Sequence, residues 1–394
     1  MPGSVILGGA RTPIGKLLGA LSALPAPRLG AAAIGEAVKR AGIAPSEVGV
    51  VVMGTVVQAG VGPNPARQAA ALAGLPMSVP ATTVNKLCLS GLHAIALADL
   101  MIGAGHHDVV VCGGMESMTR APHLLPGART GYRYGAAAAV DALDADALVC
   151  AFDGVSMGAA TERYQANLGI SREEQDAFAA RSHQRAAQAA ETGRFAEEIV
   201  PVTVPARRAE LTVATDEGVR PDTTAESLAR LRPAFAPDGT VTAGSSSQLS
   251  DGGCALVVAS RDYAERLGVE PLAEIGAYGT VAGPDPSLLA QPANAVRDAL
   301  ARDGSLKPSD LDLLEINEAF AGVAIHSTRE LGVDPDRVNV NGGAIALGHP
   351  VGMSGARLVL SLALELRRRG GGTGAAALCG GGGQGDALVL RSTT

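Results

Sequence analysis

The chain has 394 residues, 47% of them hydrophobic and 18% charged, and its formal net charge is −7. This length and apolar content allow two fused domains or one large α/β body with a buried core. The acidic balance argues against a nucleic-acid partner, because nucleic-acid-binding domains usually carry a basic face. The five cysteines are widely spaced and form no CxxC pair, so neither a disulfide framework nor a metal site fits.

The first residues, M-P-G-S-V-I-L, lack the basic flank and apolar run of a signal peptide. No apolar run reaches the length of a membrane span. We therefore expect a soluble, reduced, cytoplasmic protein without a membrane partner.

The chain contains an internal repeat. Residues 41–54 read A-G-I-A-P-S-E-V-G-V-V-V-M-G, and residues 304–318 read G-S-L-K-P-S-D-L-D-L-L-E-I-N-E. Each pattern predicts the end of a helix, a turn of Pro, Ser and an acidic residue, and then a strand buried on both faces. Further along, the pair S-G opens an apolar helix twice, and each of these helices leads to a strand that ends in C-G-G.

These features recur at nearly one offset along the chain. The matched pairs are Pro45 and Pro308, 263 residues apart, Ser90 and Ser354, 264 apart, and Cys112 and Cys379, 267 apart. Three matched features in one order indicate a duplicated unit. Each unit alternates strands with helices, so two units packed together predict a layered α/β architecture.

Between the two units, residues 115–244 are more polar and predict an inserted loop domain. Ser171 and Glu174 form a capping-box pattern, a helical period follows, and Gly193 is placed to end that helix. Residues 125–146 have no strong period, and we expect an oligomer arm there. The expected organisation is a first half (1–114 and 245–268), the inserted domain (115–244) and a second half (269–394).

Cys88 lies in V-N-K-L-C-L-S-G-L-H-A, at or just before the start of the helix that Ser90 opens. A free cysteine is often a small buried hydrophobe, so a packing role is one interpretation. At a helix N-terminus, however, the helix dipole and the free N–H groups favour a thiolate and lower its pKa. This position makes Cys88 a candidate nucleophile.

The second half offers candidate partners for Cys88. His349 lies five residues before Ser354 in N-V-N-G-G-A-I-A-L-G-H-P-V-G-M-S-G-A-R, the repeat counterpart of the Cys88 loop, so a pseudo-twofold axis would bring the two loops together. Cys379 precedes four glycines, which leave room for a substrate and expose N–H groups to an oxyanion. Asn317, in I-N-E-A-F, follows a buried strand at the end where functional groups usually lie. The structural alternatives are a turn histidine, a buried thiol and a helix cap.

Together these motifs resemble the thiolase family. The resemblance rests on N-K-L-C-L-S-G-L, E-I-N-E-A-F-A, the segment around G-H-P and L-C-G-G-G-G-Q-G-D-A, and it extends to A-R-T-P-I-G, G-G-M-E-S-M-T and G-T-V-T-A-G. It runs essentially from end to end, and the joint set is highly specific although each piece alone is weak. It implies a duplicated, layered α/β/α/β/α fold with an inserted loop domain, and an acyltransferase that acts on acyl-CoA.

The resemblance also implies roles for individual residues. Cys88 becomes acylated, and His349 takes its proton. Cys379 is the acid and base toward the second substrate, Asn317 holds a water of one oxyanion hole, and the N–H groups of Cys88 and Gly381 form the other. CoA is a substrate and product that lies against the loop domain, and no cofactor is tightly bound. The matching contacts to CoA and the acyl group are Ser247, Arg220, Ser227, Leu148, Met157 and Phe320.

The implied reaction is the reversible condensation of two acetyl-CoA to acetoacetyl-CoA and CoA. It needs a covalent acyl carrier, a base of tuned pKa and donors aimed at the enolate oxygen. Met157, Leu289 and Phe320 are expected to close the pocket behind a short acyl group, which favours acetyl. Two features depart from the family pattern: Ser156 replaces a histidine found in many relatives, and G-S-S-S-Q-L-S-D-G replaces G-N-A-S-G-I-N-D-G.

Three alternatives share parts of this pattern. A degradative 3-ketoacyl-CoA thiolase with a wider pocket would have the same four catalytic residues. A ketoacyl synthase usually pairs its cysteine with two histidines, or with a histidine and an asparagine, and the presence of Cys379 and N-E-A-F argues against it. A non-catalytic, lipid-binding relative would not need Cys88, His349 and Cys379 together. The resemblance further implies a homodimer or homotetramer.

Overall fold

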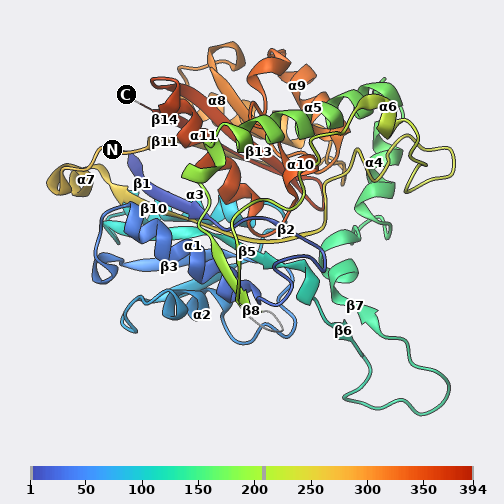
Figure 1. Ribbon diagram of the computed structural model, residues 1–394, viewed down its shortest axis with the longest axis horizontal. Coiled ribbons are helices and arrows are strands. Elements are labelled where there is room, and N and C mark those ends of the chain that lie inside the picture. The colour runs from blue at the N-terminus through green and yellow to red at the C-terminus, as the bar shows by residue number, and fades with distance from the viewer. Residues whose placement is uncertain (1–2, 206–209, 393–394) are drawn as a thin grey trace.

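The computed structural model describes residues 3–205 and 210–392 (Figure 1). The first half forms a sheet in the order β4-β3-β5-β10-β1, in which β3, β4 and β5 are parallel and β10 is antiparallel to β5 and β1. The short β2 pairs with β10. The strands are β1 (Ser4–Arg11), β2 (Gly15–Lys16), β3 (Val50–Gly54), β4 (Ala81–Val84), β5 (Val109–Ser117) and β10 (Ser250–Ser260).

The second half repeats this topology. Its strands lie in the order β12-β13-β14-β11, with β12 parallel to β13 and β14 antiparallel to both neighbours. A parallel bridge between Leu314 and Val338 stands where β4 stands in the first half. The strands are β11 (Ala273–Ala282), β12 (Leu313–Ile316), β13 (Gly372–Gly380) and β14 (Gln384–Ser392). The duplication that the sequence predicts is therefore confirmed, and a short pairing of β1 with β11 joins the two sheets.

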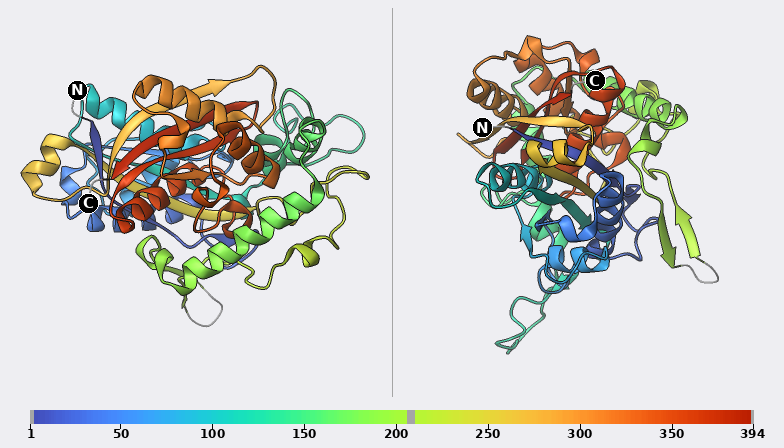
Figure 2. Two further views of the ribbon diagram at one scale, coloured as in Figure 1. Left: turned by 90° about the horizontal axis from the view of Figure 1, so that it is seen from above. Right: turned by 90° about the vertical axis from the view of Figure 1, so that its left-hand side faces the viewer.

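Helices form three layers around the sheets (Figure 2). α1 and α2 cover the outer face of the first sheet, α8 and α9 cover that of the second, and α3 and α11 lie between the sheets and pack on each other. A separate apolar cluster fills each of these interfaces. The layered α/β/α/β/α fold is thus confirmed. The helices are α1 (Ala26–Arg40), α2 (Pro65–Leu72), α3 (Ser90–Gly103), α7 (Arg261–Leu267), α8 (Gln291–Asp303), α9 (Ala321–Leu331), α10 (Ala344–Leu347) and α11 (Ser354–Arg368).

The two S-G pairs mark the point where α3 and α11 cross. A Cβ on Gly91 would lie 2.9 Å from the nitrogen of Ala356, and one on Gly355 would lie 2.5 Å from the nitrogen of Leu92. Only glycine allows backbones to approach so closely. The N-termini of both helices, and the loops before them, therefore meet at the centre of the molecule.

The predicted turns of Pro, Ser and an acidic residue are single turns of 3₁₀-helix, Pro45–Glu47 and Pro308–Asp310. In the first, the Glu47 carboxylate accepts the N–H of Ala44 at 2.7 Å, and in the second Asp310 accepts that of Lys307 at 3.0 Å. Each acidic side chain thus caps its own turn just before a buried strand. The 3₁₀ turn Pro335–Arg337 is capped differently, because the Asp334 carboxylate before it accepts the N–H of Asp336 at 2.9 Å.

The inserted segment wraps around one side of the molecule. Its predicted helix is confirmed as α5 (Arg172–Glu191), where the Ser171 hydroxyl accepts the N–H of Glu174 at 3.2 Å. The Glu174 carboxylate binds Arg329 at 2.6 Å instead of completing the capping box. The remaining elements are Met118–Arg120, β6 (His123–Leu124), β7 (Val140–Asp141), Asp144–Leu148, α4 (Met157–Gln165), Arg194–Glu197, β8 (Val202–Pro205), β9 (Glu210–Val213) and α6 (Ala225–Leu228). Because β5 continues to Ser117, it crosses the expected boundary at residue 114, and the domain boundaries stay predictions.

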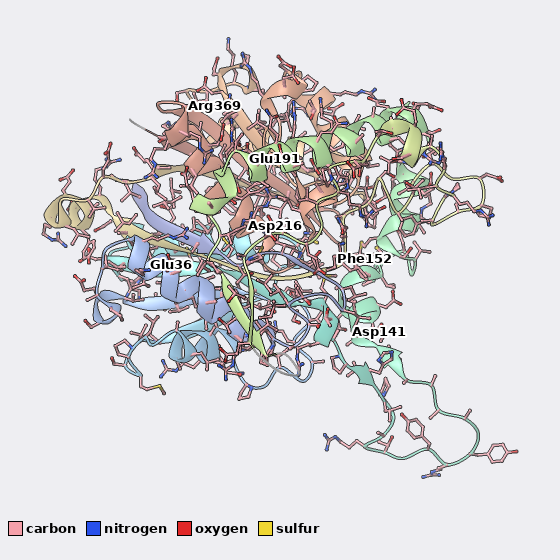
Figure 3. All side chains as sticks on the ribbon, in the orientation of Figure 1. Glu36, Asp141, Phe152, Glu191, Asp216 and Arg369 are labelled. Carbon is pink, nitrogen blue, oxygen red and sulfur yellow. The ribbon has the colours of Figure 1, made fainter. Side chains whose placement is uncertain are left out.

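Residues 125–139 project from the body between β6 and β7, and their side chains point away from the rest of the chain (Figures 1 and 3). Asp141 lies at the base of this extension (Figure 3). Tyr134 is fully exposed, and Leu125 is more than half exposed. Such a shape suits the expected oligomer arm, whose role stays a prediction.

Arg11, from the motif A-R-T-P-I-G, ties the inserted segment to β1. Its guanidinium is fully buried and donates to Glu198 at 2.7 Å and to both carboxylate oxygens of Asp216 at 2.7 and 2.9 Å. A buried cation needs such partners, because an uncompensated charge in the interior is costly. Within residues 3–205 and 210–392, no helix has the length and hydropathy needed to span a bilayer.

Candidate active site

Cys88 lies in a tight turn between β4 and α3. The helix begins at Ser90, two residues after the cysteine, as the sequence predicts. Leu87 adopts a left-handed φ of 53°, which is rare for a leucine and stores strain. Two hydrogen bonds hold the turn in this conformation. The Ser90 hydroxyl accepts the N–H of Lys86 at 2.8 Å and donates to the carbonyl of Leu87 at 2.6 Å. The strained backbone fixes the direction in which the thiol points.

The expectation of a lowered pKa at Cys88 is wrong for the free protein. Burial raises the pKa of the thiol to about 11, although the N–H groups of Gly381 and of Cys88 itself act in the opposite direction. The start of the helix is therefore too weak to offset desolvation of the charged form. At neutral pH Cys88 is a thiol, and its nucleophilic form requires a base.

His349 is buried in the loop that precedes α11, and its hydrogen bonds define its tautomer. Nδ1 lies 2.6 Å from the hydroxyl of Ser354, and that hydroxyl also lies 2.9 Å from the carbonyl of Pro350. Since the hydroxyl has one proton and gives it to the carbonyl, it accepts the Nδ1–H of the imidazole. Nε2 consequently carries the lone pair, which faces the amide nitrogen of Asn317. Burial, followed by the charge of Arg357, lowers the pKa of His349 to about 4, so the ring is neutral at pH 7.

Cys379 and Asn317 complete the group. Cys379 is the last residue but one of β13 and is buried, and this burial raises the pKa of its thiol. The amide nitrogen of Asn317 lies 3.4 Å from Nε2 of His349. Among the described residues, the Asn317 amide oxygen is buried without a hydrogen-bond partner. A water is a suitable partner for such an oxygen.

One cavity of about 530 Å³ contains most of these groups. Its floor includes Cys88, His349, Cys379 and Gly381, and its walls come from the inserted segment and from the residues after β12. The other lining residues are Met118, Asp144, Ala147, Leu148, Ser156, Met157, Gly158, Arg220, Ala234, Phe235, Ala243, Ser246, Ser247, Gln248, Leu249, Leu288, Ala319, Phe320 and Val351. No cluster of side chains that would hold a metal ion occurs in the part of the chain that the structure describes.

Comparison with known protein families decides the assignment. Residues 4–262 match the N-terminal domain of thiolase, and residues 269–392 match its C-terminal domain. The chain belongs to the thiolase family.

This thiolase is similar over its whole length to several named relatives. It is 57% identical to a probable acetyl-CoA acetyltransferase of Mycolicibacterium smegmatis, over 98% of this chain and 100% of that protein. It is 49% identical to an acetyl-CoA acetyltransferase of Pseudomonas aeruginosa, over 98% of each. The crystal structure of the acetyl-CoA acetyltransferase of Bacillus anthracis matches with a TM-score of 0.96 at 42% identity, over 99% of both chains.

The structure brings most of the predicted site residues of this thiolase into the cavity, while their catalytic and CoA-binding roles stay predictions. Asn317 is not a lining residue but lies directly behind His349. Ser227 is exposed at the start of α6, where it bonds with Thr224 outside the cavity lining. The expectation for Leu289 needs correction, because Leu288 lines the cavity and Leu289 packs behind it.

Phe235 is a lining residue that sequence reasoning missed. Its ring meets that of Phe320 edge-on, with centroids 6.1 Å apart. A Cβ on Gly158 would lie 2.3 Å from the Phe235 ring, so the glycine after Met157 makes room for it. The glycine was visible in the sequence, but its aromatic neighbour, 77 residues away in the chain, was not.

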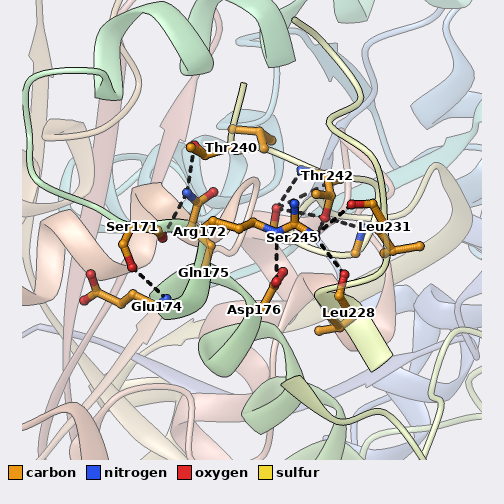
Figure 4. A network of polar contacts seen from close by, with 12 residues as sticks. Ser171, Arg172, Glu174, Gln175, Asp176, Leu228, Leu231, Thr240, Thr242 and Ser245 are labelled. Atoms are coloured by element: carbon orange, nitrogen blue, oxygen red, sulfur yellow. Dashed lines mark hydrogen bonds and ion pairs between the residues drawn. The ribbon is translucent and has the colours of Figure 1, made fainter. Parts of the chain in front are cut away.

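The first turn of α5 holds the wall that the inserted segment contributes (Figure 4). Arg172 donates to the carbonyl of Leu228 at 2.8 Å, and the Gln175 amide donates to the hydroxyl of Thr240 at 3.1 Å. Residues 246–249, a few positions further on, line the cavity. This polar network therefore sets the position of the wall on which Ser247 lies.

Proposed function

We propose that the protein is an acetyl-CoA C-acetyltransferase that condenses two acetyl-CoA to acetoacetyl-CoA and CoA, reversibly, through an acetyl-cysteine. The observation that carries this proposal is the convergence of Cys88, His349 and Cys379 on one cavity, which Gly381 also lines. The names of the full-length relatives support the same reaction.

In the first half-reaction the Cys88 thiol proton passes to Nε2 of His349. The thiolate attacks the thioester carbonyl of acetyl-CoA, the bond from carbon to the CoA sulfur breaks, and the CoA thiolate takes the proton from His349. Because Nδ1 already carries a proton that is bonded to Ser354, Nε2, beside the amide nitrogen of Asn317, takes the new one. The N–H groups of Cys88 and Gly381 would stabilise the oxyanion. The neutral thiol and neutral imidazole give a base that is charged only during reaction.

In the second half-reaction the Cys379 thiol gives its proton to the neutral His349, and the resulting thiolate removes a proton from the methyl group of a second acetyl-CoA. The carbanion attacks the acetyl group on Cys88, and as acetoacetyl-CoA forms the Cys88 thiolate leaves and takes the proton back from His349. Since burial raises the pKa of the Cys379 thiol, its thiolate is a strong base, as a carbon acid demands. The Asn317 amide beside His349 would hold the water that stabilises the enolate oxygen.

The acyl group is proposed to be short. Met157, Leu288 and Phe320 lie on the cavity wall with Phe235, so an added methylene would meet packed side chains. Ser156 caps α4 by accepting the N–H of Ala159 at 3.2 Å, so it serves the helix as well as the wall. The second candidate, a degradative thiolase of broader chain length, is favoured only by the small size of Ser156.

A thiolysis assay tests the proposal. Acetoacetyl-CoA and CoA are mixed with the protein, and acetyl-CoA is quantified by chromatography. We expect two acetyl-CoA for each acetoacetyl-CoA consumed, and an acetyl adduct on the Cys88 peptide by mass spectrometry after treatment with acetyl-CoA. If neither acetyl-CoA nor the Cys88 adduct forms, the protein is not an enzyme of this kind, and the non-catalytic, lipid-binding interpretation is correct.

The finer cellular and quaternary assignments are proposals as well. We propose a cytoplasmic homotetramer or homodimer in which residues 125–146 act as the arm that joins dimers. The exposed apolar and aromatic side chains of the arm suit contact with another copy of this chain. Light scattering of the purified protein tests this, and a monomer of about the 39.5 kDa chain mass would exclude it.

A further inference from the structure

A buried carboxylate lies between the two halves, outside the catalytic set. Glu116, near the end of β5, is fully buried. Its Oε2 accepts the N–H of Val56 at 2.9 Å and that of Gly352 at 3.0 Å. Its Oε1 accepts the N–H of Val57 and the hydroxyl of Thr55, both at 3.2 Å. Four donors from both halves of the chain therefore converge on one side chain.

No cation accompanies Glu116, since it takes part in no ion pair with any residue that the structure describes. Burial raises the pKa of its carboxyl to about 7, and the four hydrogen bonds oppose this rise. Every partner is a donor, and an ionised carboxylate is the acceptor-only group that matches them. The side chain is thus built to accept hydrogen bonds rather than to pair with a base.

Hydrogen bonds run from Glu116 to both of the loops that carry the reacting groups. On one side, the carbonyl of Val56 accepts the amide N–H of Asn85 at 3.3 Å, and Asn85 begins the loop that presents Cys88. On the other side, the N–H that Glu116 accepts belongs to the segment H-P-V-G-M, three residues after His349. Glu116 therefore stands midway along a continuous path from the nucleophile loop to the base loop.

Glu116 and Thr55 lie too close to Gly352 for any side chain to fit at that position. A Cβ there would lie 2.7 Å from Oε2 of Glu116 and 2.7 Å from Cα of Thr55. The Glu116 charge also reaches the site, because it contributes to the raised pKa of the Cys88 thiol. The carboxylate therefore acts on the site both through geometry and through charge.

We propose that Glu116 is a positioning residue for acyl transfer, whose carboxylate fixes the separation between the Cys88 loop and the His349 loop. It does not line the cavity, so it acts through these two residues and not on substrate. The proposal rests on the proposed thiolase function, because it assigns Glu116 to that same reaction.

Glu116→Gln removes the charge at nearly constant shape and turns one acceptor into a donor that faces other donors. For thiolysis of acetoacetyl-CoA we expect kcat to fall about ten- to a hundredfold, because small displacements of reacting groups are costly, while KM for CoA stays within about twofold. We also expect the pH midpoint for alkylation of Cys88 by iodoacetamide, followed by peptide mass spectrometry, to move to lower pH, since a nearby negative charge has gone. A loss of stability alone would not move that midpoint.

Glu217→Gln is the matched control. The Glu217 carboxylate also accepts two backbone N–H groups, those of Lys16 at 2.9 Å and Ala20 at 3.0 Å. Like Glu116, it does not line the cavity. We expect kcat and the Cys88 midpoint to stay unchanged in this variant. If Glu116→Gln fails to fold, Thr55→Val removes one donor at constant shape, and we expect a loss of kcat of about two- to fivefold.

An unchanged kcat or an unchanged Cys88 midpoint in Glu116→Gln would overturn the proposal, as would an unchanged kcat in Thr55→Val where that variant stands in for it. Failure of the proposed function is a distinct outcome. In that case the wild-type protein itself would not cleave acetoacetyl-CoA, whereas the alkylation midpoints would still report whether Glu116 acts on Cys88.

Discussion

The loops before α3 and α11 come from one repeated unit, yet each carries a different reactive group. When the two are aligned on S-G, Asn85 corresponds to His349, and Cys88 corresponds to Gly352. In the first loop the Asn85 side chain accepts a backbone N–H two residues further on and closes the turn. In the second loop the glycine gives its N–H to Glu116. Under the proposed function, each half would use one of the two positions for chemistry and the other to hold its loop.

The two cysteines that end C-G-G strands show the same division. Cys112 is fully buried in the core between the sheets, and its strand continues to Ser117. Cys379 faces the cavity, and its strand ends one residue later, where a run of glycines begins. Duplication supplied two equivalent places beside the pseudo-twofold axis, and the length of the strand decides which thiol meets the cavity.

Removing the nucleophile should have the largest effect. In Cys88→Ser we expect kcat for thiolysis to fall by at least about a thousandfold, because the hydroxyl cannot replace the thiolate as acyl carrier. Intact-mass measurement after acetyl-CoA treatment should find an adduct on the wild-type protein and none on the variant. An adduct on any other cysteine of the variant would contradict the assignment of Cys88.

Next in size is the contrast between the paired cysteines. Cys379→Ala should lower kcat by about 10²- to 10⁴-fold, as expected for loss of an acid–base group, with little change in the unfolding midpoint. Cys112→Ala should instead lower the free energy of unfolding by about 1–2 kcal/mol, because it leaves a small cavity. Its kcat should stay within about twofold of the wild type. Steady-state kinetics and urea unfolding of both variants measure this. Equal losses of kcat would mean that the two strand ends are not functionally distinct.

Sequence patterns could predict the duplicated fold because it rests on local signals that occur twice. The acidic turns, the S-G helix starts and the buried strands each require particular residues at fixed spacing. The convergence of Cys88 with His349 also follows from the repeat, since equivalent loops meet at a twofold axis. What the patterns could not supply are contacts between segments that lack a repeat partner.

Four particular misses illustrate this limit. The pKa of Cys88 depends on how far the whole fold removes water from around the thiol, and no local signal reports that. Phe235 reaches the cavity from an irregular stretch of the inserted segment. Leu288, and not Leu289, lines the wall, because a shift of one residue in an irregular segment changes which side chain points inward. Glu116 was visible only as part of a family motif, and its donors from both halves appear only in three dimensions.

The third prediction concerns substrate chain length. It depends on the part of the cavity wall that the inserted segment and the second half provide. If Met157, Leu288, Phe235 and Phe320 close the cavity, each added methylene must displace packed side chains, at a cost of roughly 1–3 kcal/mol. We expect kcat/KM to fall about ten- to a hundredfold for each added methylene, and 3-ketohexanoyl-CoA has two more of them than acetoacetyl-CoA. Thiolysis rates for the four-, six- and eight-carbon substrates measure this. A flat or rising profile would mean that the cavity is open and the degradative interpretation is correct.

The smallest expected effect concerns the position that differs between the loops, Asn85 in one and His349 in the other. The pKa of His349 is lowered from 6.5 to about 4, so between these values the unfolded chain binds a proton that the folded chain does not. The contribution of this histidine to the free energy of unfolding is therefore fully present above pH 6.5. It is lost as the pH falls toward 4. Between pH 7 and pH 5 the wild-type protein should lose about 2 kcal/mol through this histidine.

His349→Asn gives the second loop the residue of the first and removes that titration. Urea unfolding at pH 7 and pH 5 should therefore show a smaller pH-dependent loss in the variant than in the wild type, by about 2 kcal/mol. His183, whose pKa burial also lowers to about 4, keeps its own contribution in both proteins, so only the difference is informative. His106→Asn, at an exposed position, is the control and should leave the pH dependence as it is. If His349→Asn and the wild type lose stability equally on acidification, the imidazole is already charged in the folded protein, and a neutral base for Cys88 would have to be sought elsewhere.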